Sequence, residues 1–433
     1  MPITSPRVPG VPGLPAWTST PDDAPGAIAH IKAAIRHRLA ASGRSIDEVF
    51  RAMADRVGAQ VDDIAGELEQ GKCAWPVIDY ADIAGGTVSP ETVVLLKRRG
   101  CMIVRNHFER RQALDWDLGI KEYVGRNKFF ENYRGAGDDF FGSVGSKPEI
   151  YPIYWSPAQI EARQSERMAN VQGFLNRLWT STADDLQWFD PDRDAMYPDR
   201  IRRRPPGTTS RGLRTHMDAG TLDLWMTRES QQAFHHLFDG TVEEFDPWSA
   251  AHRTTGPQFV GTTMTSAFRT FQGWTALSDM DHDQGVLQSI PIADAMGYLM
   301  LRPLLGDVPD DDMCGVAVGK AFPVSEQWHA PLLRAVAGIP DVRAGDSAWW
   351  HCDMPHAVAP VADQKGWGNV MYIPAAPWCA RNERYSESVR QAFLDGDSPT
   401  DFPEEHYERT WPDRPGLDAL TTYGRRGFGF TTG

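Results

Sequence analysis

The sequence contains few cysteines and no long apolar run, and both absences exclude classes of protein. Its five cysteines are scattered over 433 residues without a C-x-x-C pair, which argues against a zinc knuckle or redox motif and predicts reduced thiols. No stretch approaches the roughly 18 apolar residues that a membrane-spanning helix requires. Residues 1–17 also lack the apolar centre of a secretion signal. We therefore expect a cytoplasmic protein without a membrane partner.

Basic residues are also in the minority. The chain has 44 lysines and arginines against 58 acidic residues, which gives a formal charge of -14. Because binding to the phosphates of nucleic acid depends on lysine and arginine, nucleic acid is not an expected partner. The sequence is rich in tryptophan, with 15 residues, and such large rings can line a deep pocket for a small-molecule substrate. The oligomeric state is left open.

The N-terminal part of the chain has a helical pattern. Residues 1–25 are rich in Pro, Gly, Ser and Thr and are predicted to form a flexible arm. A helix is predicted over 24–41, and a second from Ser45 toward Gln70, because Ser45 precedes Glu48 by three residues, the spacing of a capping box. We therefore expect a helical region over 26–95 that packs on a larger domain over 96–433, which carries insertions.

The rest of the chain alternates short apolar runs with Gly, Pro and Asp. Helices are predicted over 109–123 and 157–179. Strands are predicted at 100–108, 200–204, 213–218, 266–278, 285–290, 348–351 and 368–374. Many short strands in the C-terminal half, combined with helices, favour an α+β protein built on a barrel or sandwich.

The tetrapeptide Thr215-His-Met-Asp218 carries the first chemical signal. Residues i and i+2 of a strand point to the same face, so His216 and Asp218 can bind one ion together. A lone H-x-D sequence also occurs by chance as a surface histidine near an aspartate. A second block, residues 344–356, adds a turn, an apolar strand and two further histidines. Two histidines and one carboxylate leave three positions of an octahedral ion open, as in non-heme Fe(II) oxygenases.

Both His351 and His356 follow the same predicted strand, so composition alone leaves the third ligand open. Residues five apart on an extended strand face opposite ways, so only one of the two can reach the metal. A turn over residues 353–355 would break this alternation, because Pro355 cannot donate to a sheet ladder.

Four blocks in a fixed order resemble the phytanoyl-CoA hydroxylase-like branch of the iron/2-oxoglutarate oxygenases. They are the H-x-D sequence, Trp274 to Asp279, Gly285 to Pro291, and Gly345-Asp346 with a histidine ten residues beyond the aspartate. The resemblance implies a double-stranded β-helix, a jelly-roll or cupin-like core, with N-terminal and flanking helices. It also implies that His216, Asp218 and His356 are the metal ligands and that His351 is not.

The whole chain from about Ala27 onward is similar to the bacterial YbiU-type proteins, a family of unassigned role. The similarity lies in residues 202–210, 323–329 and 369–377. It implies the same fold and the cofactors Fe(II), 2-oxoglutarate as cosubstrate, and O₂, but it supplies no substrate.

These resemblances imply a dioxygenase that oxidises a small organic molecule, most simply by hydroxylation, and releases succinate and CO₂. Desaturation and ring closure are alternative outcomes of the same chemistry. Two other functions fit the same three residues. One is a zinc-dependent hydrolase in which the open position holds an activated water. The other is a cupin-like binding protein without catalytic activity.

The group that would anchor 2-oxoglutarate is not obvious. Many enzymes of this class have an arginine about ten residues beyond the distal histidine, and it pairs with the far carboxylate of the cosubstrate. Residues 364–369 of this chain contain Lys365 but no arginine. Arg269, in a predicted strand near the metal strand, is the preferred candidate. Lys365 and the pair Arg202 and Arg204, which share one strand face, are the alternatives.

Overall fold

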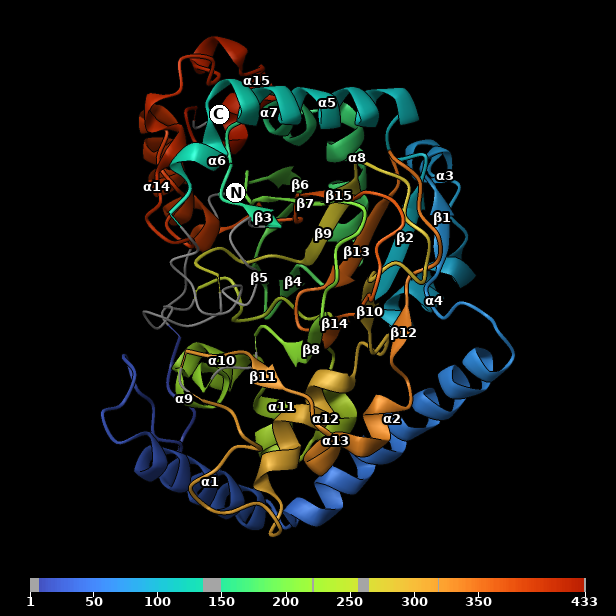
Figure 1. Ribbon diagram of the computed structural model, residues 1–433. Helices are drawn as coiled ribbons and strands as arrows, with labels where there is room; N and C mark the ends of the chain where they lie inside the picture. Colours follow the sequence, from blue (N-terminus) through green and yellow to red (C-terminus); the bar gives the residue numbers. More distant parts are fainter. Residues whose placement is uncertain (1–7, 135–148, 220–221, 256–264, 318, 432–433) are drawn as a thin grey trace.

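The computed structural model describes residues 8–134, 149–219, 222–255, 265–317 and 319–431. These residues form helices and several sheets, which confirms a mixed α+β fold. Figure 1 shows the strands in the middle of the molecule, with α5, α7 and α8 at one end and α1, α2 and α12 at the other. None of the helices in the described ranges combines the length and apolarity needed to cross a bilayer.

The larger sheet has seven strands. In spatial order they are β1 (Val77–Asp79), β2 (Cys101–Arg105), β13 (Ser347–His351), β9 (Phe271–Ala276), β15 (Gly368–Tyr372), β7 (Ile201–Arg204) and β3 (Ile150–Tyr151). Strands β1 and β2 are parallel, and the other neighbours are antiparallel. The predicted strands at 100–108, 200–204, 348–351 and 368–374 therefore all belong to this sheet.

The smaller sheet has five strands. In spatial order they are β11 (Phe322–Pro323), β8 (Leu213–Met217), β14 (His356–Val358), β10 (Leu287–Ser289) and β12 (Ala337–Gly338). Successive strands change sheets: β7 to β10 alternate between the larger and the smaller sheet, and so do β13 to β15. The chain thereby brings segments that are far apart in the sequence onto facing sheets.

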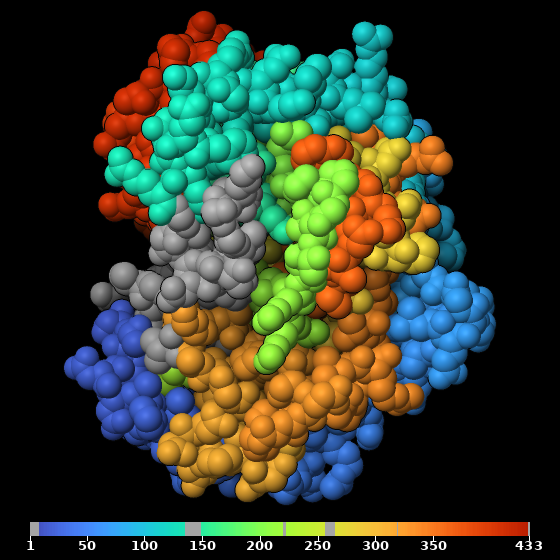
Figure 2. All heavy atoms as spheres, viewed as in Figure 1, coloured from blue at the N-terminus to red at the C-terminus, as the bar shows by residue number. Residues whose placement is uncertain are grey.

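Helices cover the two sheets. They are α1 (Ala24–Ala41), α2 (Ile46–Glu69), α3 (Tyr80–Gly85), α4 (Pro90–Arg99), α5 (Arg110–Arg126), α6 (Phe129–Asn132), α7 (Pro157–Arg163), α8 (Glu166–Asn176), α9 (Asp223–Met226), α10 (Arg228–Ala233), α11 (His235–Asp239), α12 (Ala295–Leu301), α13 (Glu326–Leu333), α14 (Ala380–Asp395) and α15 (Thr422–Gly427). Two small two-stranded sheets pair β4 (Thr182–Ala183) with β5 (Leu186–Gln187) and β6 (Asp190–Asp194) with β16 (Pro377–Trp378). In Figure 2 the teal segment with α5 and α6 covers the upper end, and the gold-to-orange segment with α12 and α13 covers the lower end.

The larger sheet is buried on both faces. Phe271 and Trp349 point outward into a core shared with α5 and α8. Trp274 and Trp350 point inward, toward the smaller sheet, and belong to a core that also contains Met217 of β8. This division follows from the two-residue period of a strand, and it explains why β9 and β13 are buried along their whole length. The inner face is the one that meets the site described below.

The N-terminal helices begin where the sequence predicts. The side chain of Ser45 accepts a hydrogen bond from the amide of Glu48 (3.2 Å), and Glu48 returns one to the Ser45 amide (2.8 Å), so a capping box starts α2. Buried residues of α1 and α2 join the inner core, as does Leu14 of the predicted arm. The first seven residues of that arm lie outside the described ranges. The division of the chain at residues 25 and 95 stays a prediction.

Two predicted elements differ from the structure. The helix predicted over 157–179 is two helices, α7 and α8, because Ser165 accepts a hydrogen bond from the Met168 amide (3.1 Å) and starts a new helix. The strand predicted over 266–278 is confined to β9. The side chain of Asn382 binds both the amide (2.7 Å) and the carbonyl (2.8 Å) of Phe268, so these backbone groups do not join a ladder. Arg269 therefore lies in the segment before the strand.

Candidate metal centre and adjoining cleft

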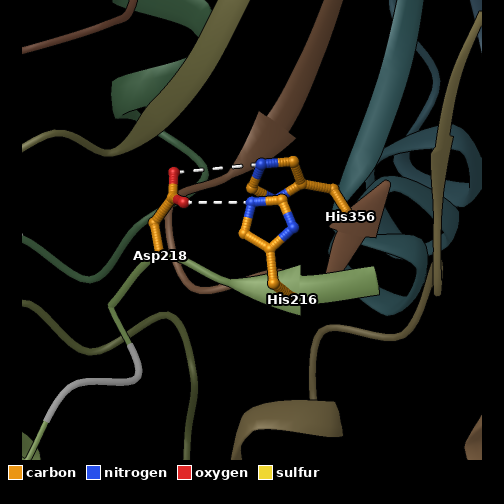
Figure 3. Close-up of side chains that lie close together, drawn as sticks. All are labelled: His216, Asp218 and His356. Atoms are coloured by element: carbon orange, nitrogen blue, oxygen red, sulfur yellow. Dashed lines mark ion pairs between the residues drawn. The ribbon is translucent and has the colours of Figure 1, made fainter. Parts of the chain in front are cut away.

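His216 and His356 lie opposite each other on neighbouring strands. Strand β8 pairs with β14 in an antiparallel register that matches His356 to His216. The two imidazole centroids are 4.4 Å apart. Asp218 follows the last residue of β8, and its carboxylate points back toward both rings (Figure 3). The two-residue spacing and the sheet pairing together gather the three side chains.

The distances suit a shared cation. Nε2 of His216 lies 3.3 Å from one carboxylate oxygen of Asp218, and Nε2 of His356 lies 3.8 Å from the other. One ligand atom from each of the three residues falls within 4.8 Å of the other two. Nδ1 of His216 donates to the Arg214 carbonyl (2.7 Å) and Nδ1 of His356 to the Met354 carbonyl (3.1 Å). These bonds keep a proton on each Nδ1 and direct both Nε2 atoms toward the carboxylate, where a bound metal would take the Nε2 lone pairs.

The electrostatics favour the metal-binding forms of His356 and Asp218, whereas His216 would have to release a proton when a metal binds. Burial, together with the neighbouring His216, lowers the pKa of His356 to about 4, so this ring is neutral near pH 7. Burial also opposes the charge of Asp218, but the two histidines outweigh it and hold the pKa of that carboxyl well below its usual range. Burial alone would lower the pKa of His216, but the hydrogen bond to Asp218 and the charge of that carboxylate outweigh burial and raise it. A neutral imidazole and a carboxylate are the ligand forms that a metal requires.

His351 lies on the opposite side of β13 from this cluster. Its Nε2 donates to the Pro247 carbonyl (3.1 Å), and its Nδ1 accepts from the Asp353 amide (3.1 Å). The imidazole stacks on Trp179 with centroids 4.5 Å apart. The turn that follows carries the chain into the smaller sheet, so the simple alternation along one strand does not extend from His351 to His356. The separation of the two histidines comes from the change of sheet.

Asp346 of the Gly345-Asp346 motif is structural. One of its carboxylate oxygens accepts from the Asn106 amide (2.9 Å), and the other accepts from the Arg343 amide (2.9 Å) and from Arg105 Nη1 (2.6 Å). Gly345 has a φ of 95°, and a Cβ there would lie 2.3 Å from the Phe108 carbonyl oxygen. The motif therefore fixes the turn that leads into β13.

Arg202 and Arg204 lie on the inner face of the larger sheet. Arg202 pairs in register with Val370, and Val370 with Ala276, and both partners belong to the inner core. Nε of Arg202 lies 3.4 Å from the Gly368 carbonyl, whereas Nη2 of Arg204 donates to the carbonyls of Gln284 (2.7 Å) and Gly285 (2.8 Å). Burial and the charge of Arg202 lower the pKa of Arg204 to about 10. In the described ranges neither guanidinium has a carboxylate within ion-pair distance.

The other two predicted anchors lie elsewhere. Lys365 is exposed, and its Nζ pairs with the Asp363 carboxylate at 2.5 Å. Arg269 is partly buried beside a cleft whose empty volume, measured out into the open solvent, is about 760 Å³. Asp218 lines the same cleft. Of the predicted candidates, Arg269 therefore shares a cavity with a proposed metal ligand.

Most of the residues that line this cleft belong to no motif that can be recognised in the sequence. They come from α9, α10, the first turn of α14 and the loops that connect other elements, and include Phe234, Arg253, Phe268, Cys352, Asp353 and Arg381. Arg253 pairs with the Asp353 carboxylate. No single segment contributes a recognisable motif, because the cleft forms only when these loops come together.

Comparison with known proteins shows the family. The sequence profile of the Gig2-like family matches residues 25–430. YbiU of Escherichia coli (strain K12), an uncharacterized protein, is 52% identical over 420 residues, which cover 96% of this chain and 99% of YbiU. The YbiU-type resemblance is thus confirmed.

Solved structures agree with this assignment. A crystal structure from Salmonella typhimurium LT2, of a protein named provisionally as an oxidoreductase, has a TM-score of 0.91 and 50% identity, covering 96% of this chain and 99% of its own. The Candida albicans protein GlcNAc Inducible Gene 2 has a TM-score of 0.76 at 24% identity, covering 95% of this chain and 90% of its own, and so shares the fold. The chain belongs to the Gig2-like family.

Proposed function

We propose that this protein is an Fe(II)- and 2-oxoglutarate-dependent dioxygenase that oxidises a small organic molecule. The reaction converts a C–H bond, 2-oxoglutarate and O₂ to a C–OH group, succinate and CO₂. The observation that carries the proposal is the convergence of His216, Asp218 and His356, whose ligand atoms lie within 4.8 Å of one another. Two imidazoles and one carboxylate leave three metal positions for the 2-oxo acid and O₂. The oxidoreductase name of the Salmonella relative is consistent with oxidation.

The strand order supports a double-stranded β-helix as the core. Strands β7, β9, β13 and β15 are neighbours in the larger sheet, and β8, β14, β10 and β12 are neighbours in the smaller one. Successive strands alternate between the sheets, with β10 and β12 together in the smaller one, as expected for a jelly roll. The core would lie within residues 96–433, and residues 26–95 would be a helical addition that packs against it.

The protein residues would hold and shield the metal. The carbonyls of Arg214 and Met354 fix the two imidazole rings, and Trp350 packs 5.5 Å from the His356 ring, between centroids. When bound, iron with 2-oxoglutarate and O₂ supplies the oxidising power. Trp350 would shield the His356 side of the site from water, which strengthens the interactions of the charged groups there.

We assign the far carboxylate of 2-oxoglutarate to Arg202. The arginine common in related enzymes is missing near Gly368, but β7 places two guanidinium groups beside that position: Arg202 lies 3.4 Å from the Gly368 carbonyl, and a Cβ at residue 368 would lie 3.3 Å from Nε of Arg204. Arg204 already donates to two carbonyls, whereas Arg202 has weaker contacts and keeps donors for a carboxylate. The exposed ion pair of Lys365 with Asp363 makes the lysine a poorer anchor.

Iron-dependent succinate formation tests the proposal. The purified full chain is loaded anaerobically with Fe(II), mixed with 2-oxoglutarate and O₂, and assayed for succinate and bound iron. Wild type should release succinate in an iron-dependent manner, and His216→Ala, Asp218→Ala and His356→Ala should lose both iron and succinate. His329→Gln is a matched control, since His329 is buried on α13 and accepts from the Ser325 amide (3.2 Å). Normal iron content and succinate release in His356→Ala would overturn the assignment.

A further inference from the structure

The cleft beside the proposed metal centre is open to solvent, so a substrate can enter it. Asp218 forms part of its wall, so a molecule in the cleft would lie next to the proposed metal ligands. Phe234 and Phe268 contribute apolar surface to the same wall. The cleft combines apolar with charged side chains, as small-molecule sites do. The polar side chains of the cleft are therefore placed to contact a bound substrate.

Arg269 differs from the other two arginines that line the cleft. Arg253 pairs with the Asp353 carboxylate, and Arg381 donates to the carbonyls of Ser266 (2.7 Å) and Thr265. Arg269 has no hydrogen-bond acceptor and no ion-pair partner in the part of the chain that the structure describes, and its Nε is buried without one. Its guanidinium carbon lies 5.4 Å from the centroid of the Tyr197 ring.

A buried guanidinium without an acceptor is costly unless a ligand supplies one. Loss of hydration around such a group is compensated when a carboxylate accepts two parallel hydrogen bonds from it. Asp218 contributes negative charge to the environment of Arg269, but the pair is not within ion-pair distance. Once a divalent metal engages Asp218, that charge is largely neutralised, and Arg269 is left facing the cleft as an uncompensated cation.

We infer that the cleft binds a small substrate that carries a carboxylate, with Arg269 holding the carboxylate and Phe234 and Phe268 contacting its apolar body. The inference rests on the proposed function for the identity of the reacting centre, and it assigns Arg269 to the substrate while Arg202 holds the cosubstrate. The carbon to be oxidised would then lie between the carboxylate at Arg269 and the metal ligands at Asp218. The substrate class is therefore an aryl- or alkyl-bearing monocarboxylic acid.

The test compares acids with their amides, which match them in shape but lack the charge. Saturation-transfer NMR on the full chain loaded with Zn(II), a diamagnetic ion that would neutralise Asp218 as Fe(II) does, measures binding of phenylacetate, benzoate, phenylacetamide and benzamide. A separate anaerobic titration of the Fe(II)-loaded protein with 2-oxoglutarate, followed by its visible charge-transfer band, measures cosubstrate binding. Both measurements are made on wild type, Arg269→Gln, Arg269→Lys and Arg202→Gln. Melting curves show which variants are folded.

At least one acid should bind wild type at least about tenfold more tightly than its amide, the effect of a charge-assisted hydrogen bond. Arg269→Gln should lose this preference and keep 2-oxoglutarate binding, Arg269→Lys should retain part of the preference, and Arg202→Gln should show the reverse pattern. Equal binding of acids and amides, or no binding of any acid, would overturn the inference. Loss of 2-oxoglutarate binding in Arg269→Gln would overturn it in favour of a cosubstrate anchor. If wild type shows no charge-transfer band, the proposed function fails while the acid preference is still measured.

Discussion

Replacing His351 with glutamine should destabilise the protein but leave its iron in place. The imidazole stacks on Trp179 at 4.5 Å and meets Trp248 edge-on at 4.8 Å, and both of its nitrogens bind backbone groups. Two aromatic contacts at about 0.5–1.5 kcal/mol each, and one hydrogen bond of similar size that glutamine cannot restore, sum to about 2–4 kcal/mol. His356→Gln removes a proposed ligand instead, so it should abolish iron binding.

Urea unfolding of the metal-free proteins, followed by tryptophan fluorescence, measures the first effect without the added stability that a bound metal would contribute. Iron content measured on the folded, reconstituted proteins gives the second. His351→Gln should show a lower free energy of unfolding and bind as much iron as wild type. If His351→Gln loses iron while His356→Gln retains it, the choice of third ligand is wrong. An unchanged free energy of unfolding in His351→Gln would refute the packing argument.

Three further changes test the framework around the site. Burial lowers the pKa of His107 to about 3, so the folded protein excludes a proton that the unfolded chain takes up below about pH 6.5. The stability from neutral His107 is complete above pH 6.5 and is lost as the pH falls toward 3, by up to about 5 kcal/mol. His107→Gln should show a shallower loss of stability in urea titrations across this range. Gly345→Ala should cost about 2–4 kcal/mol in the same assay, because of its φ of 95° and the Phe108 carbonyl, while a stability equal to wild type would contradict the proposed turn. Gly273→Ala should lower the melting temperature, because the new Cβ would lie 2.3 Å from the Trp349 ring, and an unchanged melting temperature would show that the sheet accommodates it.

Local patterns predicted the elements that depend on nearby residues. The start of α2 follows from Ser45 and Glu48, which satisfy each other's backbone groups three residues apart. The pairing of His216 with Asp218 follows from the period of a strand. The break between α7 and α8 was missed because the apolar spacing continues across Ser165, although serine is a favoured N-cap.

Features that depend on contacts between distant segments were harder to predict. His356 faces His216 because β14 pairs with β8 in the smaller sheet, and no spacing within the sequence determines that register. The cleft combines Arg269 with residues from several loops, and the strand predicted there ends short because Asn382 binds the backbone of Phe268. The sequence therefore identified the candidate ligands, but it could not separate a cosubstrate anchor from a substrate anchor.

The most direct test of the central claim is the visible spectrum of the anaerobic Fe(II) protein during titration with 2-oxoglutarate. If His216, Asp218 and His356 hold iron with open positions for the 2-oxo acid, a weak charge-transfer band should appear and saturate at a single iron per chain. The band should be absent from His356→Gln. A wild-type protein that binds zinc tightly and shows no band with Fe(II) and 2-oxoglutarate would contradict the claim and favour a zinc-dependent hydrolase.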